Sequence, residues 1–219
     1  SEGVNQVMGK VESEGKRAIP VARVKSVIGV IVVADTVREN SLEAIQRLKR
    51  LGIKTVMITG DNMRTAKYIA EQIGIDEHHA ELLPEQKVAF IRELKKSHVV
   101  AMVGDGVNDA PALAQATVGF AIGSGTDIAA DSADVVLMRS DLNDVVTAIE
   151  LSKSTIRNIK QNLFWAFFYN TMGIPLAAGV FYAFGGLLLN PMFEAAAISM
   201  SSVSVVSNAL RLRGFKPSK

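Results

Sequence analysis

The stretch Met102-Val103-Gly104-Asp105-Gly106-Val107-Asn108-Asp109-Ala110-Pro111-Ala112-Leu113 predicts the fold of this chain. Residues 99–103 are apolar and predict a buried strand, whereas residues 109–116 have helical spacing with Pro111 in the first turn. Gly104 and Gly106 permit an abrupt turn between the two elements. The stretch therefore predicts a strand-to-helix corner that carries several polar side chains.

Two carboxylates and an amide lie at this corner. Mg²⁺ prefers oxygen ligands and usually takes one or two carboxylates together with water and substrate phosphate. Asp105 and Asp109 supply the carboxylates, and Asn108 adds a neutral contact. We therefore predict a Mg²⁺ and phosphate site here. The alternative is an ordinary Asp/Asn/Gly turn in which an aspartate caps the following helix.

A second corner has the same layout. Residues 53–58 are apolar and end in Thr59-Gly60-Asp61-Asn62, after which residues 64–73 have helical spacing. Ligands of open α/β sheets lie beyond the carboxyl ends of strands, where helix N-termini offer free N–H groups. We expect Thr59 and Gly60 to hold a phosphoryl oxygen by hydroxyl and backbone N–H, and Asp61 to orient or cap. The alternative is a simple helix cap.

A lysine lies between the two corners. In Leu83-Pro84-Glu85-Gln86-Lys87, Pro84 predicts the start of an amphipathic helix that continues to Lys96. The ammonium group of Lys87 is a point charge suited to a transferred phosphate. The alternative is a solvated helix lysine.

The wider pattern predicts an α/β domain with a parallel sheet between helix layers. Strands are expected near 27–34, 53–58, 99–103, 117–121 and 134–138. Helices are expected near 40–51, 63–73, 84–96, 109–115 and 126–131, with a further helix from Leu142. We divide the chain into a remnant of another domain (1–25), a phosphoryl domain (26–152) and a C-terminal part (153–219).

The C-terminal part predicts a transmembrane helical hairpin. Residues 163–184 contain no charged side chain, and residues 187–210 contain only Glu194. A helix needs about 20 apolar residues to span a bilayer, so we expect spans at about 162–184 and 187–210. Lysines and arginines flank the hairpin but are absent from its turn, which places the phosphoryl domain and the C-terminus on the cytoplasmic side. The alternative is a buried hairpin of a soluble protein.

Composition excludes several classes. A net charge of +2 does not indicate a nucleic-acid partner, and the absence of cysteine excludes disulfides. The first residues have neither a basic nor an apolar signal-peptide region.

The motifs resemble the phosphorylation domain of P-type ATPases, a branch of the haloacid-dehalogenase-like fold. The resemblance rests on Thr59-Gly60-Asp61, Lys87 and residues 104–111. It implies that Asp105 and Asp109 hold Mg²⁺ and that Lys87 neutralises the charge of the phosphoryl group. It also implies that Thr59, Gly60 and Asp61, here called the Thr59 loop, position that group. The family's hinge, usually Asp-Pro, is Asp35-Thr36 here, which removes the fixed φ of proline.

Parts of the family's machinery are missing. The D-K-T-G-T string with the aspartate nucleophile and the T-G-E actuator loop do not occur in these 219 residues. The resemblance therefore implies an ATP-dependent, membrane-embedded pump whose actuator, nucleotide-binding domain and other membrane helices lie outside this chain. Residues 1–25 resemble the last strands of that nucleotide-binding domain. We expect the chain alone to be inactive and its sheet to lack the nucleophile's strand.

The last two helices resemble those of Cu(I)-transporting ATPases. This implies ion ligation by Tyr169 and Asn170 in the first helix and by Ser202 in the second, with Met200 as a further candidate. The family's methionine position holds Ile198 here, which weakens selectivity for a soft ion. A copper chaperone is an implied partner. The alternatives are a pump for Zn²⁺, Cd²⁺ or another cation, and a non-catalytic membrane fragment.

Overall fold

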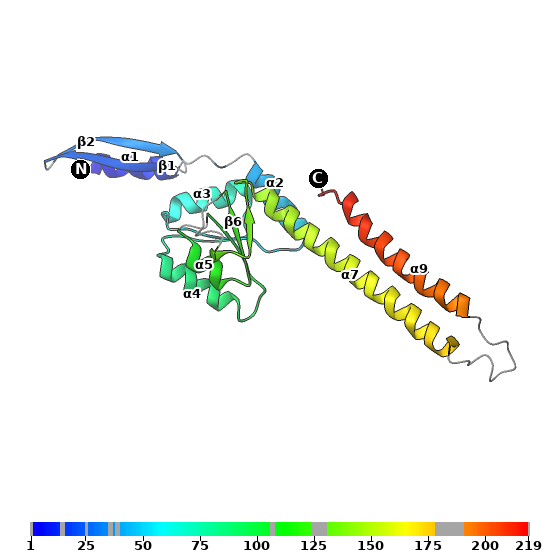
Figure 1. Cartoon of the computed structure of the whole chain (residues 1–219). Helices are drawn as coiled ribbons and strands as arrows, with labels where there is room; N and C mark the ends of the chain where they lie inside the picture. The colour runs from blue at the N-terminus through cyan, green and yellow to red at the C-terminus, as the bar shows by residue number, and fades with distance from the viewer. Residues whose placement is uncertain are drawn as a thin grey trace. The chain divides into compact units, whose positions relative to one another are not determined.

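The computed structural model describes residues 2–13, 16–24, 26–34, 37, 40–105, 108–123, 131–177 and 191–218. The chain divides into two compact units, Ser1–Val146 and Thr147–Lys219. Figure 1 shows mixed helices and strands in the first unit and two long helices in the second.

Most of the first unit alternates helices and strands, as the sequence predicts. The elements are α2 (Asn40–Arg50), β3 (Val56–Ile58), α3 (Met63–Ile73), β4 (Glu77–His79), α4 (Pro84–Leu94), β5 (Ala101–Gly104), α5 (Ala110–Gln115), β6 (Val118–Ile122) and β7 (Val135–Leu137). Strand β4 was not predicted, because it has three residues and no apolar run. Residues 124–130 of the helix predicted near 126–131 lie outside the described residues.

The strands of this part are parallel and form two ladders. Strand β3 pairs with β4, and β5, β6 and β7 pair in that order. Val103 lies opposite Phe120, which lies opposite Val135. The predicted parallel α/β arrangement is confirmed. Among the described strands, no ladder joins β3 to β5.

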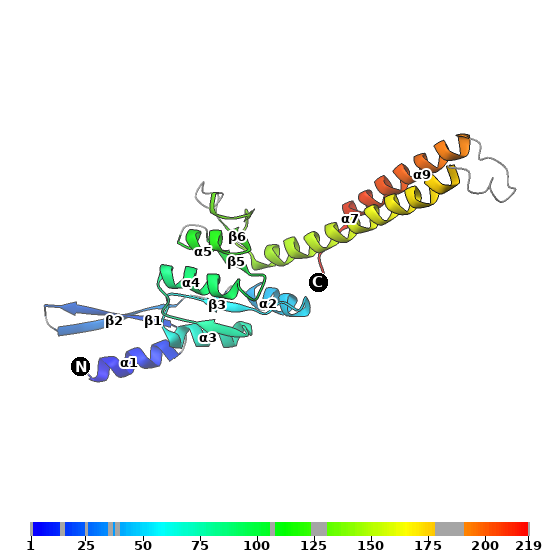
Figure 2. The same cartoon turned by 90° about the horizontal axis from the view of Figure 1, so that it is seen from below.

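One hydrophobic core lies beneath both ladders. Met102 of β5, Ile91 of α4 and Leu113 of α5 are buried in it, and Ile58 of β3 packs against it. Helices α4 and α5 lie side by side, as Figure 2 shows. Burial of such side chains stabilises a fold by about 1.5–3 kcal/mol each. The core therefore holds the ends of β3 and β5 in one unit.

The first strand of the predicted phosphoryl domain does not join the parallel ladders. Strand β2 (Ser26–Ala34) pairs antiparallel with β1 (Lys16–Arg23), with a register shift between Val21 and Ala22. Helix α1 (Glu2–Ser13) contacts both. The prediction that residues 27–34 contribute to the parallel sheet is therefore wrong. Strands β1 and β2 are close together in the chain, so little loop-closure entropy is lost when they pair, and they form a hairpin.

A polar turn ties the start of β3 to the start of β4. The Asp76 carboxylate accepts hydrogen bonds from the backbone N–H of Thr55 (2.8 Å) and from its hydroxyl (2.7 Å). It also lies 2.7 Å from Lys49 Nζ of α2. The lysine and the Thr55 hydrogen bonds hold the pKa of Asp76 well below its usual value of 3.8. The turn thus fastens α2 to the β3–β4 ladder.

The second unit is a pair of helices. Helix α7 (Leu142–Ala177) begins in the first unit and continues into the second, and α9 (Pro191–Leu210) is followed by the short 3-10 helix η1 (Arg211–Gly214). Asn208 of α9 donates to the Asn162 side chain (2.8 Å) and accepts at its backbone carbonyl from Asn158 (2.6 Å). These bonds hold α9 beside α7.

Within the described part of the chain, no helix is both long enough and apolar enough to cross a membrane. The predicted spans over 162–184 and 187–210 are therefore not confirmed. The charged first half of α7 and the serines and asparagine of α9 lower the hydropathy of the helices as they stand. Residues 178–190, which hold the predicted connection, lie outside the described residues.

Replacing Asp76 with Asn should lower the free energy of unfolding at neutral pH by about 1–2 kcal/mol, because hydrogen bonds to a charged group are lost and partial exposure screens the ion pair. The folded-state pKa lies below the unfolded value of 3.8. The contribution of the Asp76 carboxylate to stability is therefore fully present above pH 3.8, and it is lost as the pH falls through the lowered pKa.

Urea denaturation of the full chain at neutral and acidic pH measures this effect. Glu93→Gln is the control, since among the described residues Glu93 pairs only with exposed Lys96 one helical turn away, and its loss should cost less than about 0.5 kcal/mol. Equal losses for the two variants, or a pH-independent loss for Asp76→Asn, would contradict the role of this turn.

Candidate functional site

The carboxyl end of β5 carries the first predicted carboxylate. Asp105 directly follows Gly104, and its side chain is exposed. Its carboxylate accepts hydrogen bonds from the backbone N–H of Asn108 and from the Asn108 side-chain amide, both at 3.2 Å. Gly106 and Val107 lie outside the described residues. Asp105 and Asn108 are therefore brought together as one oxygen-rich turn.

Asp109 starts helix α5 but does not cap it with its side chain. Its backbone carbonyl accepts from Ala112 N and Leu113 N, each at 2.9 Å, whereas its carboxylate makes no cap hydrogen bond. Instead Asp109 Oδ1 lies 2.9 Å from Lys87 Nζ. The structure thus departs from the alternative in which this aspartate is merely a helix cap.

The Lys87–Asp109 contact is partly shielded from solvent. The two side chains are 17% and 20% exposed. Lys87 lies in the first turn of α4, whose start is fixed by Pro84 and by a 2.8 Å hydrogen bond from Leu83 N to the Gln86 side chain. Lys87 is therefore held by tertiary packing, and the alternative of a freely solvated lysine is wrong.

Gly104 leaves room for the aspartate. A Cβ at this position would lie 3.0 Å from Asp109 Cβ and 3.1 Å from Asp109 Oδ2. Any larger residue would push the carboxylate away from its present place. From the sequence, the only reason for a glycine at position 104 is the abrupt turn between the strand and the helix. The structure adds a second reason for it, the close approach of β5 to Asp109.

The second corner has the predicted layout. Thr59 follows β3, and its hydroxyl donates to Asp61 Oδ2 (2.9 Å) and accepts from Asp61 N (3.1 Å). The backbone of Thr59 is also bonded to His79 O and Leu82 N, each at 3.0 Å. The hydroxyl is therefore oriented by its own loop and by the residues after β4.

The cap of α3 is Asn62, whose side chain accepts from Thr65 N at 2.9 Å. Asp61 instead makes hydrogen bonds with Thr59, as the other predicted role, orientation of Thr59, requires. Gly60 is exposed, and a Cβ there would come within 3.5 Å of Leu82 O.

A cavity of about 390 Å³ opens beside Asp105. It lies where β5, β6 and β7 end, and its lining comprises Asn40, Ser41, Gly104, Asp105, Ile122, Ser140, Asp141 and Leu142. Asp141 Oδ1 accepts from Asn143 N (2.9 Å) and Asp141 Oδ2 from Asn40 Nδ2 (3.2 Å). Sequence reasoning did not single out Asn40 or Asp141. The signal for Asp141 was its place as a helix cap directly before Leu142.

The donor set of the β5 corner fits a hard divalent cation. It offers the carboxylate oxygens of Asp105 and Asp109 and the amide oxygen of Asn108, which are the ligand types that Mg²⁺ takes. Among the described residues, no three acidic or histidine side chains converge as a self-sufficient metal site. Such a corner suits an ion that also keeps water or phosphate ligands.

The residues predicted to hold a transported ion lie on the two long helices. Tyr169 is half-buried, with its ring 6.0 Å from that of Trp165, and Asn170 is exposed. Ser202 is exposed, and the Met200 side chain lies outside the described residues. Ser204 donates to its own helix at Ser201 O (2.8 Å). An ion site on these helices therefore stays a prediction.

Comparison with known proteins places these features in context. Residues 2–117 match the family model described as haloacid dehalogenase-like hydrolase. The chain is 51% identical, over 99% of its length, to a probable copper-exporting P-type ATPase of Archaeoglobus fulgidus. It is 56% identical, over 94% of its length, to copper-transporting ATPase 2 of Rhizobium meliloti. The chain spans only 27% and 25% of these two relatives.

A solved structure is similar as well. The crystal structure of a zinc-transporting PIB-type ATPase in the E2.Pi state matches 97% of this chain and 34% of its own, with a TM-score of 0.79 and 38% identity.

Gly104→Ala tests the close approach of β5 to Asp109. The added methyl group should displace the carboxylate, weaken its contact with Lys87, and lower the free energy of unfolding by about 1–3 kcal/mol. Urea denaturation of the full chain measures the loss. In Gly29→Ala the new Cβ meets nothing within 4 Å, so this control should change by less than about 1 kcal/mol. A Gly104→Ala variant as stable as its parent would show that the approach is not tight.

Proposed function

The chain belongs to the haloacid dehalogenase-like hydrolases, and from this membership we propose that it is the magnesium- and phosphate-binding part of a P-type ATPase that exports Cu(I) through an aspartyl phosphate. The single observation that carries the proposal is the 2.9 Å contact of Lys87 with Asp109 beside Gly104 and Asp105. It joins a cation and a carboxylate from separate elements at the end of a parallel strand.

The residues of the site have separate roles. Asp105 and Asp109, with Asn108, would hold Mg²⁺, which when bound offsets the negative charge of a phosphoryl group. Lys87 holds Asp109 in place and brings a positive charge to the same corner. Such fixed charges favour the more negative transition state without reorganisation during the reaction.

The Thr59 loop supplies hydrogen-bond donors. Asp61 fixes the rotamer of Thr59, so the loop presents the backbone N–H of Gly60 beside an ordered hydroxyl group, which would turn its one hydrogen from Asp61 to a bound phosphoryl oxygen. Donors held in this way suit the oxygens of a phosphoryl group. The roles of Thr59, Gly60, Asp61 and Lys87 together are phosphoryl positioning and charge neutralisation.

The acceptor aspartate comes from another part of the pump. The chain has no D-K-T-G-T string, and it spans about a quarter of the length of the relatives that it matches. Strands β3 and β5 share a core but no ladder among the described strands. A further strand carrying the nucleophile would pair at these edges. ATP binding, the actuator loop and the remaining membrane helices would also lie in the other three quarters.

We place the α7–α9 hairpin in the membrane. From Leu163 to Ala177 helix α7 has no charged side chain, and its large apolar side chains face outward, for example Leu163 (54% exposed), Phe167 (62%) and Ile174 (68%). An apolar surface of this kind needs a cover of lipid or of other helices. The phosphoryl domain would then lie on the cytoplasmic side, where a copper chaperone could deliver the ion.

Copper is the proposed cargo because the relatives at 51% and 56% identity carry copper in their names. Tyr169, Asn170, Ser202 and Met200 are the proposed contacts. A pump for a divalent ion is the second candidate. It is favoured by the similarity to the zinc-transporting structure and by Ile198 at the family's methionine position.

Asp105→Asn in the complete pump should reduce Mg²⁺-dependent phosphoenzyme by about a hundredfold or more, because an anionic metal ligand is lost at the reacting group. Phosphoenzyme formed from radiolabelled ATP measures the effect. Asp131→Asn makes the same change of charge at an exposed position outside the site and should leave the phosphoenzyme level unchanged. Normal phosphoenzyme in Asp105→Asn would refute the metal role.

Met200→Leu in the complete pump should lower Cu(I) affinity by about tenfold or more, because Cu(I) prefers thioether sulfur whereas leucine keeps the volume of the side chain. Equilibrium competition with a Cu(I) chelator measures the affinity. Met172→Leu on α7 is the matched control, since Met172 is 54% exposed and has no assigned role. Unchanged affinity in Met200→Leu would remove Met200 from the ion site.

A further inference from the structure

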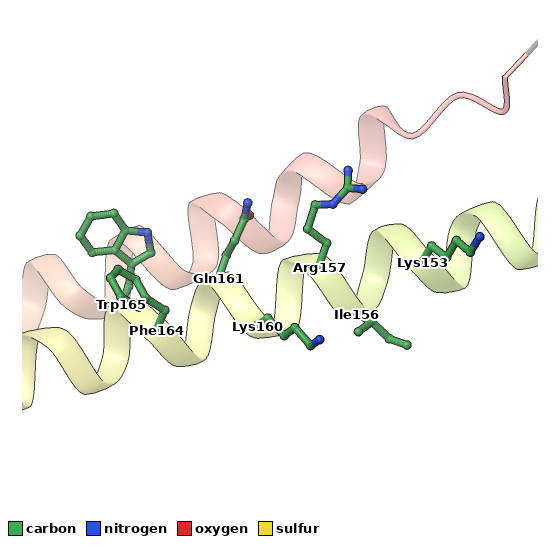
Figure 3. Close-up of a pocket in the computed structure, with 7 residues that line it drawn as sticks. All are labelled: Lys153, Ile156, Arg157, Lys160, Gln161, Phe164 and Trp165. Atoms are coloured by element: carbon green, nitrogen blue, oxygen red, sulfur yellow. The ribbon is translucent and has the colours of Figure 1, made fainter. Parts of the chain in front are cut away.

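A groove of about 530 Å³ runs along α7 in the second unit. Its lining comprises Lys153, Ile156, Arg157, Lys160, Gln161, Phe164 and Trp165. Figure 3 shows Arg157, Gln161 and Trp165 projecting on one side of the helix, and Ile156 and Lys160 on the other. The spacing of four residues within each set makes two ridges along the helix. The groove lies between these ridges.

The groove gathers positive charge that the described residues do not neutralise. Lys153 and Arg157 are four residues apart, and Arg157 and Lys160 are three apart, so like charges are neighbours along the groove. Helix α7 has no aspartate or glutamate from Leu151 to Ala177. In the described part of the chain, none of the three cations makes an ion pair. This repulsion is relieved by binding an anion.

The other end of the groove is apolar and aromatic. Phe164 and Trp165 are 59% and 43% exposed there, whereas Ile156, which is 51% exposed, lies between Lys153 and Arg157 at the cationic end. The rings of Phe164 and Trp165 meet edge to face, with centroids 5.4 Å apart. Tryptophan with one apolar and one polar side favours the head-group depth of a bilayer. From Lys153 to Trp165 the helix rises by about 18 Å, and the lining changes along it from cationic to aromatic.

The groove meets the surface that holds the two helices together only at its edge, at Gln161. The bonds to α9 are made by Asn158 and Asn162 and, at the edge of the groove, by Gln161, whose side chain accepts from Asn208 Nδ2 at 3.3 Å. At about 100° per residue, the two asparagine side chains of α7 point well away from the middle of the groove. The groove is accessible while α9 is in place, because the side chains that line it are exposed.

We propose that this groove binds an anionic phospholipid. Lys153, Arg157 and Lys160 contact the phosphodiester, with the planar guanidinium of Arg157 suited to two of its oxygens, and Phe164 and Trp165 contact the glycerol and the first acyl carbons. The charge of the three cations selects the anionic lipid, and the aromatic end selects a lipid over free phosphate. The proposal rests on the membrane placement of the hairpin proposed above.

Quenching of tryptophan fluorescence tests the site, because Trp165 is the single tryptophan of the chain and lies in the groove. The full chain is reconstituted in phosphatidylcholine nanodiscs that contain equal small fractions of either brominated phosphatidylglycerol or brominated phosphatidylcholine. Each basic side chain near an anionic membrane contributes about fivefold in association. We expect brominated phosphatidylglycerol to be favoured near Trp165 by about fivefold or more, and inorganic phosphate not to compete.

The variants locate the effect. K153Q/R157Q/K160Q should reduce the preference to less than about twofold, whereas K153R/K160R should keep it. The control K67Q/R92Q/K96Q removes the same charge from exposed positions of the first unit and should keep the preference, and circular dichroism checks that every variant stays helical.

Each remaining outcome overturns a stated part. Equal quenching by the two lipids overturns the lipid site and leaves the membrane placement standing. No quenching by either lipid overturns the membrane placement and the lipid site with it. A preference that survives in K153Q/R157Q/K160Q, or that inorganic phosphate abolishes, overturns the assignment to this groove.

Discussion

The contact between Lys87 and Asp109 is the interaction on which the candidate site depends. Both groups are partly buried, and a charge removed from water is costly unless an opposite charge or hydrogen bonds compensate it. The lysine and the aspartate therefore require each other, and they lie on different helices, α4 and α5. The site is thus as rigid as the packing of these helices. Ile91 of α4 and Leu113 of α5, buried in one core, provide that rigidity.

The same core explains how two strand ladders make one site. Strand β3 brings the Thr59 loop and β5 brings Asp105, and no ladder joins these strands among the described residues. Their common support is the apolar cluster, in which Ile58 of β3 packs against the residues around Met102 of β5. The edges of β3 and β5 are the places where backbone pairing with another strand is available. A phosphoryl site completed from elsewhere in a larger protein is consistent with this arrangement.

The helical unit shows a different balance of forces. Its two helices are joined by asparagine side chains, and large apolar groups face outward from α7. In a membrane, polar groups commonly hold helices together while apolar groups face lipid. Here Asn158 and Asn162 make the main polar contact, and the cationic and aromatic groove meets that contact only at Gln161. One helix thus presents two surfaces with different chemistry.

The sequence by itself determined the local structure. The apolar runs, the glycines and the turn residues fixed the two strand-to-helix corners at Thr59 and Asp105 and the limits of α3, because these features act within a few residues of one another. Only the tertiary structure decided which distant groups meet. It brought Lys87 to Asp109, paired β2 with β1 instead of the parallel strands, and placed Asn208 against Asn162. Such contacts depend on packing between elements that are far apart in the chain. A local sequence pattern contains no information about that packing.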